Sequence, residues 1–189
     1  MSSVRKNQKK LDEALVLLQK NEAVALSAAL QIYTDYGQAD ILPLLFKALD
    51  GKERAQQQAL VQFLSDVKDT DAIEFFIAYL QEEQDSENRK LVLSAIWNSK
   101  LPFDAHLPFF VMLATQGDYL EALDCLTIIE NMTGPFDESQ LLEAQLLLKE
   151  YIEERAPQTD QKAQIMSEIA WFVKEQNEGI DADLLIDNE

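Results

Sequence analysis

The chain has 189 residues, of which 47% are hydrophobic, and its formal net charge is −18. This apolar content supports a core in one domain or one short repeat array, and only five Gly and five Pro favour helices joined by short turns over a β-sandwich. An acidic surface of this size repels phosphate backbones, which argues against nucleic-acid binding.

The charge is uneven along the chain. The first 20 residues carry five basic and two acidic groups, whereas residues 137–189 carry four and 14. We interpret the early basic cluster as the solvated start of a helix. It consists of Arg5, Lys6, Lys9 and Lys10. No long apolar segment follows it, so we expect neither a secretion signal nor a membrane span.

Cysteine usage indicates the redox compartment. Cys125 is the only cysteine, so the chain cannot form an internal disulfide. A reducing compartment is the simplest interpretation, and we expect a cytoplasmic protein.

Apolar residues recur with the 3.6-residue period of amphipathic helices. Leu60, Phe63, Leu64 and Val67 are one example. No stretch alternates as a strand would. The predicted helices cover residues 3–19, 22–36, 41–49, 52–67, 72–80, 88–99, 104–116, 118–132, 137–155 and 160–178.

Ten helices in sequence pair off as five hairpins. Each hairpin is too small to bury its apolar face alone, so neighbouring hairpins must stack. The predicted hairpins cover residues 3–36, 40–67, 71–99, 104–132 and 137–178.

A Pro-Phe-Asp triplet occurs twice, at residues 102–104 and 135–137. Proline ends one helix, and the aspartate can accept hydrogen bonds at the start of the next. Equivalent aspartates extend the series with steps of 31, 33 and 33 residues. They are Asp40, Asp71, Asp104 and Asp137. We therefore predict a cap at the start of the second to fifth hairpins, with Thr70 as the alternative to Asp71, and the triplet phenylalanines packed as staples.

The segment Ile41-Leu42-Pro43-Leu44-Leu45 resembles the proline-bearing first helix of a HEAT repeat. Asp50 followed by Arg54, and Asp85 followed by Arg89, resemble the acidic turn and arginine of that family. The resemblance covers roughly residues 38–132. It implies a right-handed α-α superhelix. With the first and last hairpins, which are assigned by helix pairing alone, we predict an all-α fold of about five antiparallel hairpins over residues 1–178, followed by an acidic tail over 179–189.

A tetratricopeptide repeat is the alternative architecture. Gln116-Gly117-Asp118-Tyr119-Leu120-Glu121-Ala122-Leu123 is similar to part of that motif, but it occurs once. Both architectures stack antiparallel helix pairs and differ in curvature.

No residue pattern indicates an enzyme. His106 is the only histidine, and it aligns with an apolar helix stripe, so we interpret it and Cys125 as packing residues. The chain has no glycine-rich phosphate loop and no cysteine pairs with metal-ligand spacing. We expect no catalytic residue, no metal and no cofactor.

The HEAT resemblance implies partner binding on the concave face, which the second helix of each hairpin lines. Polar residues opposite the predicted core stripes form the candidate surface: Gln58, Gln62, Ser65, Lys90, Ser94, Asn98, Asp124, Thr127 and Asn131. Ser65, Asn98 and Asn131 lie 33 residues apart. The alternatives are a groove that accepts a peptide from a partner protein and a plain solvated surface.

The leading functional prediction is a non-catalytic adaptor or scaffold that binds a protein. One competing class is a HEAT-like nucleic-acid-processing protein of the DNA glycosylase type, which the acidic charge disfavours. Another is assembly into a homo-oligomer through exposed apolar ends. The acidic tail could dock to a partner, cover the last hairpin or simply be a frayed end.

Overall fold

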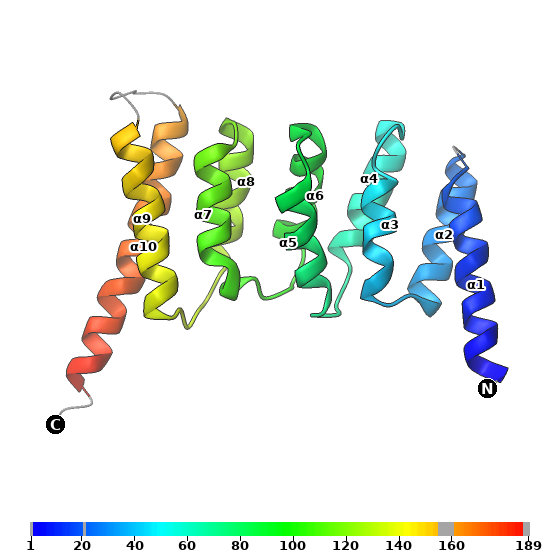
Figure 1. Ribbon diagram of the computed structural model, residues 1–189, viewed down its shortest axis with the longest axis horizontal. Coiled ribbons are helices and arrows are strands. Elements are labelled where there is room, and N and C mark those ends of the chain that lie inside the picture. The colour runs from blue at the N-terminus through cyan, green and yellow to red at the C-terminus, as the bar shows by residue number, and fades with distance from the viewer. Residues whose placement is uncertain (1, 21, 155–160, 187–189) are drawn as a thin grey trace. The chain divides into compact units, whose positions relative to one another are not determined.

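The computed structural model describes the backbone of residues 2–20, 22–154 and 161–186, and the side chains of 8–20, 22–153 and 161–177. Within these residues all regular structure is helical, with ten α-helices, two short 3-10 helices and no strand (Figure 1). The predicted all-α class is confirmed.

The chain divides into two compact units, Met1–Leu101 and Pro102–Glu189. The helices of the first unit are α1 (Ser2–Leu18), α2 (Ala23–Tyr36), η1 (Ala39–Ile41), α3 (Leu42–Lys47), α4 (Arg54–Ser65), α5 (Ala72–Glu82) and α6 (Ser86–Asn98). Those of the second are η2 (Asp104–His106), α7 (Leu107–Gln116), α8 (Tyr119–Glu130), α9 (Glu138–Glu154) and α10 (Gln161–Ile186).

In the first unit, first helices pack on first helices and second helices on second helices. Helix α3 contacts α5, and α4 contacts both α2 and α6. The ring of Phe46 on α3 stacks on Tyr79 of α5, with centroids 4.5 Å apart. A polar contact adds to this packing, because the Asn88 side-chain amide donates to the Asp50 carboxylate at 2.6 Å. Successive hairpins of this unit therefore stack, as the repeat spacing predicts.

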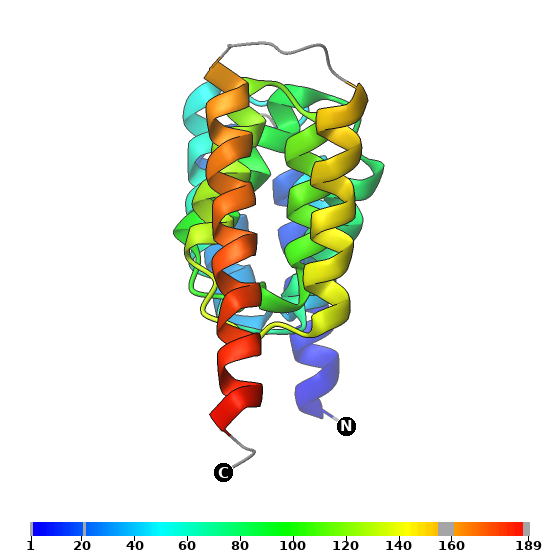
Figure 2. The same ribbon diagram turned by 90° about the vertical axis from the view of Figure 1, so that its left-hand side faces the viewer.

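The second unit repeats the scheme with two hairpins. Helix α7 packs on α8 and α9, and α10 packs on α8 and α9. Figure 2 shows α9 and α10 side by side, running in opposite directions. The triplet phenylalanines are buried, with Phe103 against Phe110 and Phe136 against Phe172. Their predicted packing at the hairpin junctions is confirmed.

The predicted aspartate caps of the first helices are wrong at three positions. Asp40 lies within η1, and Asp71 precedes α5 without a side-chain cap bond. Asp104 lies in η2, where its Oδ1 accepts hydrogen bonds from the backbone N–H groups of Thr133 and Gly134, each at 2.7 Å. Capping requires an extended backbone at the residue before the helix, whereas Asp71 is helical (φ −62°, ψ −17°).

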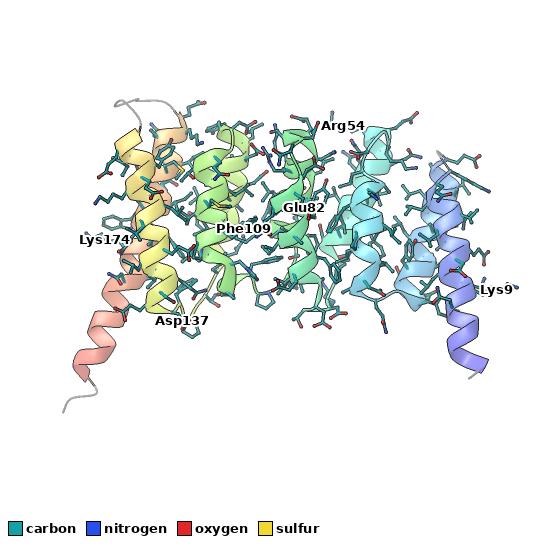
Figure 3. The ribbon with its side chains drawn as sticks, viewed as in Figure 1. Lys9, Arg54, Glu82, Phe109, Asp137 and Lys174 are labelled. Carbon is teal, nitrogen blue, oxygen red and sulfur yellow. The ribbon has the colours of Figure 1, made fainter. Side chains whose placement is uncertain are left out.

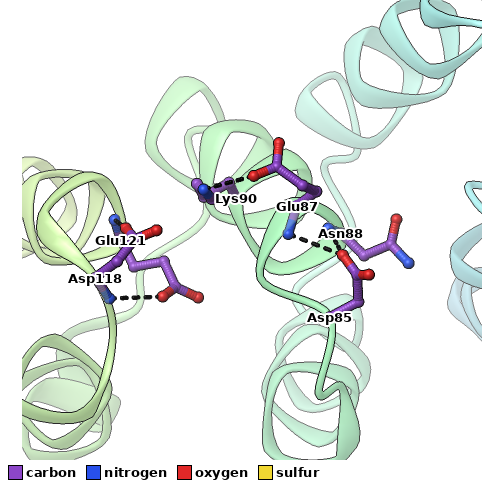
Figure 4. A network of polar contacts seen from close by, with 6 residues as sticks. All are labelled: Asp85, Glu87, Asn88, Lys90, Asp118 and Glu121. Carbon is purple, nitrogen blue, oxygen red and sulfur yellow. Dashed lines mark hydrogen bonds and ion pairs between the residues drawn. The ribbon is translucent and has the colours of Figure 1, made fainter.

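Side-chain caps instead begin two of the second helices, α6 and α8, whereas α2 has no side-chain cap bond. Asp85 accepts hydrogen bonds from the backbone N–H groups of Glu87 and Asn88 at the start of α6 (Figure 4). Asp118 and Glu121 form a reciprocal capping box at the start of α8. Both aspartates have the extended backbone that a cap requires, because they follow short turns.

The predicted start of α9 agrees with the structure, whereas the predicted end of α10 does not. Asp137, labelled in Figure 3, directly precedes α9 as expected, and its N–H donates to the Gln140 side chain. In contrast, α10 does not end at Gly179 but continues to Ile186. A helix interior tolerates a glycine at about 1 kcal/mol when the neighbouring residues favour the helix, as Ala182, Leu184 and Leu185 do. The predicted tail thus begins as helix, and residues 187–189 lie outside the described part.

Candidate partner-binding surface

The first three predicted surface residues lie on α4. Gln58 and Gln62 are exposed, and the Gln62 amide donates to Asp66 at 3.1 Å. Ser65 is only 7% exposed, and its hydroxyl donates to the Val61 carbonyl oxygen at 2.8 Å. The expectation that Ser65 faces a partner is therefore wrong, because its hydroxyl is turned to its own helix.

The next three residues lie on α6, which packs on α4 within the first unit. Lys90 is half-buried and forms an ion pair with Glu87 at 2.7 Å. Ser94 is half-buried, and its hydroxyl donates a hydrogen bond to the Leu91 carbonyl oxygen. Asn98 is exposed. Stacking thus brings the predicted residues of α4 and α6 onto neighbouring helices of one unit.

The last three predicted residues lie on α8 of the second unit or directly after it. Asp124 and Thr127 are half-buried, and Asn131, which follows the helix, is exposed. The Thr127 hydroxyl donates to the Leu123 carbonyl at 3.0 Å.

The spacing of 33 residues between Ser65, Asn98 and Asn131 has a local explanation. The Ser65 hydroxyl and the side-chain amides of Asn98 and Asn131 each donate to the backbone carbonyl four residues earlier. Each bond closes the last turn of a second helix, where such side chains are common. The repeat of these residues therefore reflects how second helices end, and does not require a partner.

Sequence reasoning missed a groove between α2 and α4. Two cavities lie there, of about 290 and 350 Å³, and Thr34 lines both. The smaller is bordered by small side chains from both helices, including Ser27, Ala55 and Ala59. Small residues at facing positions leave this space, and they are the signal in the sequence that could have indicated it.

Tyr33 of α2 borders the larger cavity and carries an unusual hydroxyl. The side chain is 3% exposed, and its oxygen has no hydrogen-bond partner among the described residues. Burial raises the pKa of Tyr33, so the phenol stays neutral at physiological pH.

The residues considered for catalysis do not gather into a site. Cys125 is fully buried on α8, as predicted for a packing residue, and His106 is half-buried in η2. In the described part of the chain, no three His, Cys, Asp or Glu side chains are placed to hold a metal ion. In the same residues, no helix is long and apolar enough to cross a membrane.

No protein-family model, curated protein sequence or solved structure matches this chain significantly.

Proposed function

We propose that this chain is a non-catalytic, HEAT-like helical repeat protein that binds another protein along its second helices. The groove between α2 and α4 is the observation that carries the proposal. Protein grooves of this kind accept an extended or helical peptide, and the exposed Ser27 and Gln31 of α2 line the smaller cavity with polar side chains that can hydrogen-bond to one.

Charge supports a protein partner over a nucleic acid. The net charge of −18 opposes approach of a phosphate backbone and favours a partner with basic residues. The lone, buried Cys125 is in keeping with a reducing compartment, so we place this function in the cytoplasm.

Filling the groove tests the proposal. Ala59 is exposed and lines the groove from α4, so Ala59→Trp would occupy the space without removing a core contact. Ala28→Trp is the matched control, because Ala28 is exposed on α2 but borders neither cavity.

The assay begins with affinity capture from the native host, followed by measurement of the Kd of the purified partner for each variant. We expect Ala59→Trp to weaken binding at least about tenfold and Ala28→Trp to leave it unchanged, with both variants retaining the helical circular dichroism spectrum. Equal affinity of the two variants would exclude the α2–α4 groove as the binding surface.

A further inference from the structure

The larger cavity of the groove is a defined pocket where α2 and α4 end. Its volume of about 350 Å³ lies at the small end of the range for ligand pockets, roughly 300–1,000 Å³. Ile41, Leu42, Phe63 and Val67 supply apolar walls. The pocket therefore suits one extended side chain with a mainly aliphatic stem.

The formal charges at the rim of this pocket are mainly negative. Helix α2 ends at Tyr36 and α4 at Ser65, while η1 begins at Ala39 in the pocket lining, so the helix ends contribute partial charges of both signs. Asp66 and Asp69 line the pocket and are exposed. Lys68 is the one cation among its lining residues, so the lining carries a net charge of −1.

We propose that this pocket binds a basic side chain, lysine or arginine, from a partner protein. The aliphatic stem packs against the half-buried Phe63 and Val67, and the cationic head lies at the rim with Asp66 and Asp69. Charge complementarity selects this occupant, because an acidic head would meet two carboxylates and an apolar one would desolvate them without compensation. The inference rests on the proposed function and names the chemistry of the partner.

Short peptides of one neutral sequence provide the probe, with lysine, arginine, norleucine or glutamate at the central position. They are titrated into the full chain while amide NMR spectra are recorded. We expect the lysine and arginine peptides to shift the resonances of Gly37 and Val67, which line the pocket, and the glutamate peptide to leave them in place. Norleucine keeps the stem and removes the charge, so it should bind at least about fivefold more weakly than lysine.

Three variants test the sign of the electrostatic effect. Asp66→Asn with Asp69→Asn should weaken the lysine peptide about three- to tenfold, whereas Lys68→Gln should strengthen it about twofold. The control, Asp12→Asn with Glu22→Gln, removes two exposed charges from the same unit outside the pocket and should change little. Circular dichroism checks that each variant folds.

Two results would overturn the inference. One is binding of norleucine and lysine peptides with equal affinity, and the other is an absence of shifts around the pocket with every peptide. If the Ala59→Trp variant still loses the captured partner in that case, the proposed function stands and only the pocket assignment fails. If the lysine peptide binds the pocket but Ala59→Trp retains the partner, the pocket assignment stands and the proposed groove fails.

Discussion

Asp104 binds the backbone of Gly134, so a residue of the first Pro-Phe-Asp triplet holds the chain just before the second. One carboxylate oxygen of Asp104 accepts the N–H groups of both Thr133 and Gly134 at 2.7 Å. The Gln140 amide adds a bond to the Ala105 carbonyl at 2.8 Å. Together these contacts tie the start of the fourth hairpin to the junction that begins the fifth.

Asp104→Ala should destabilise the second unit by about 2 kcal/mol, because two N–H groups lose a charged acceptor. Asp104→Asn keeps an uncharged amide oxygen as acceptor, so its loss of unfolding free energy should be about half as large. Urea denaturation followed by circular dichroism measures both values. If neither variant lowered the free energy of unfolding measurably, water would have replaced the carboxylate as the acceptor of these hydrogen bonds.

Lys162 makes a second long-range contact, with the end of α7, whose contribution to stability can be tested. It is 6% exposed, and its ammonium group donates to the carbonyl oxygens of Thr115 and Gly117 where α7 ends. Lys162→Met should therefore lower the free energy of unfolding by about 2 kcal/mol. Lys149→Met is the control, because Lys149 is exposed on α9 with a loose ion pair at 3.8 Å, and its loss should cost at most about 0.5 kcal/mol.

Tyr33→Phe should stabilise the protein. The Tyr33 hydroxyl is buried without a partner in the described part of the chain, and removing such a group relieves its desolvation cost. We expect a gain of about 1 kcal/mol in urea denaturation. Tyr36→Phe changes an exposed tyrosine on the same helix and should have no measurable effect. A loss of stability in Tyr33→Phe would show that the hydroxyl has a partner, such as water.

Glu83 should contribute a pH-dependent part of the stability. Partial burial alone would raise its pKa, but hydrogen bonds from the Asp85 N–H and the Tyr79 hydroxyl outweigh this and hold the pKa of Glu83 below its usual value of 4.5. Burial, followed by the bond to Glu83, in turn raises the pKa of Tyr79. A carboxylate with a lowered pKa stabilises the fold above its unfolded pKa and loses this contribution as pH falls through the folded value.

We therefore expect Glu83→Gln to melt below the wild type at neutral pH, with the difference shrinking as the pH falls below about 4.5. Glu82→Gln removes the same charge one residue earlier, from an exposed side chain, and serves as the control. Thermal melts from pH 3 to 7 compare the three proteins. A constant difference between Glu83→Gln and wild type across that range would contradict the assignment.

Local patterns predicted most of the helices correctly. Predicted helices 3–19 and 22–36 correspond to α1 and α2, and the hairpin boundaries agree within a few residues except at the end of the last hairpin, where α10 continues to Ile186. The predicted end of α10 at Gly179 is wrong because one glycine cannot outweigh the helix-forming residues beside it. The predicted exposure of Ser65 is wrong because helical periodicity gives the direction in which a side chain points from the helix axis. It does not show how closely the next helix approaches that side chain.

The candidate surface was predicted less well. The α4 residues Gln58 and Gln62 are exposed as expected, but no residue of α2 was included. The groove depends on the space between α2 and α4, which neither helix specifies alone. The spacing of 33 residues marked the ends of second helices rather than a binding ladder.

By itself, the sequence determined the all-α class, the pairing of helices and the 33-residue repeat, because helix periodicity and turn residues act over a few neighbours. Only the tertiary structure decided that Asp104 binds Gly134, that Lys162 binds the end of α7, and that α2 and α4 leave a groove. These features join residues of different hairpins, which lie far apart in the chain. Their geometry follows from how the hairpins pack, and so it cannot be read from any one segment.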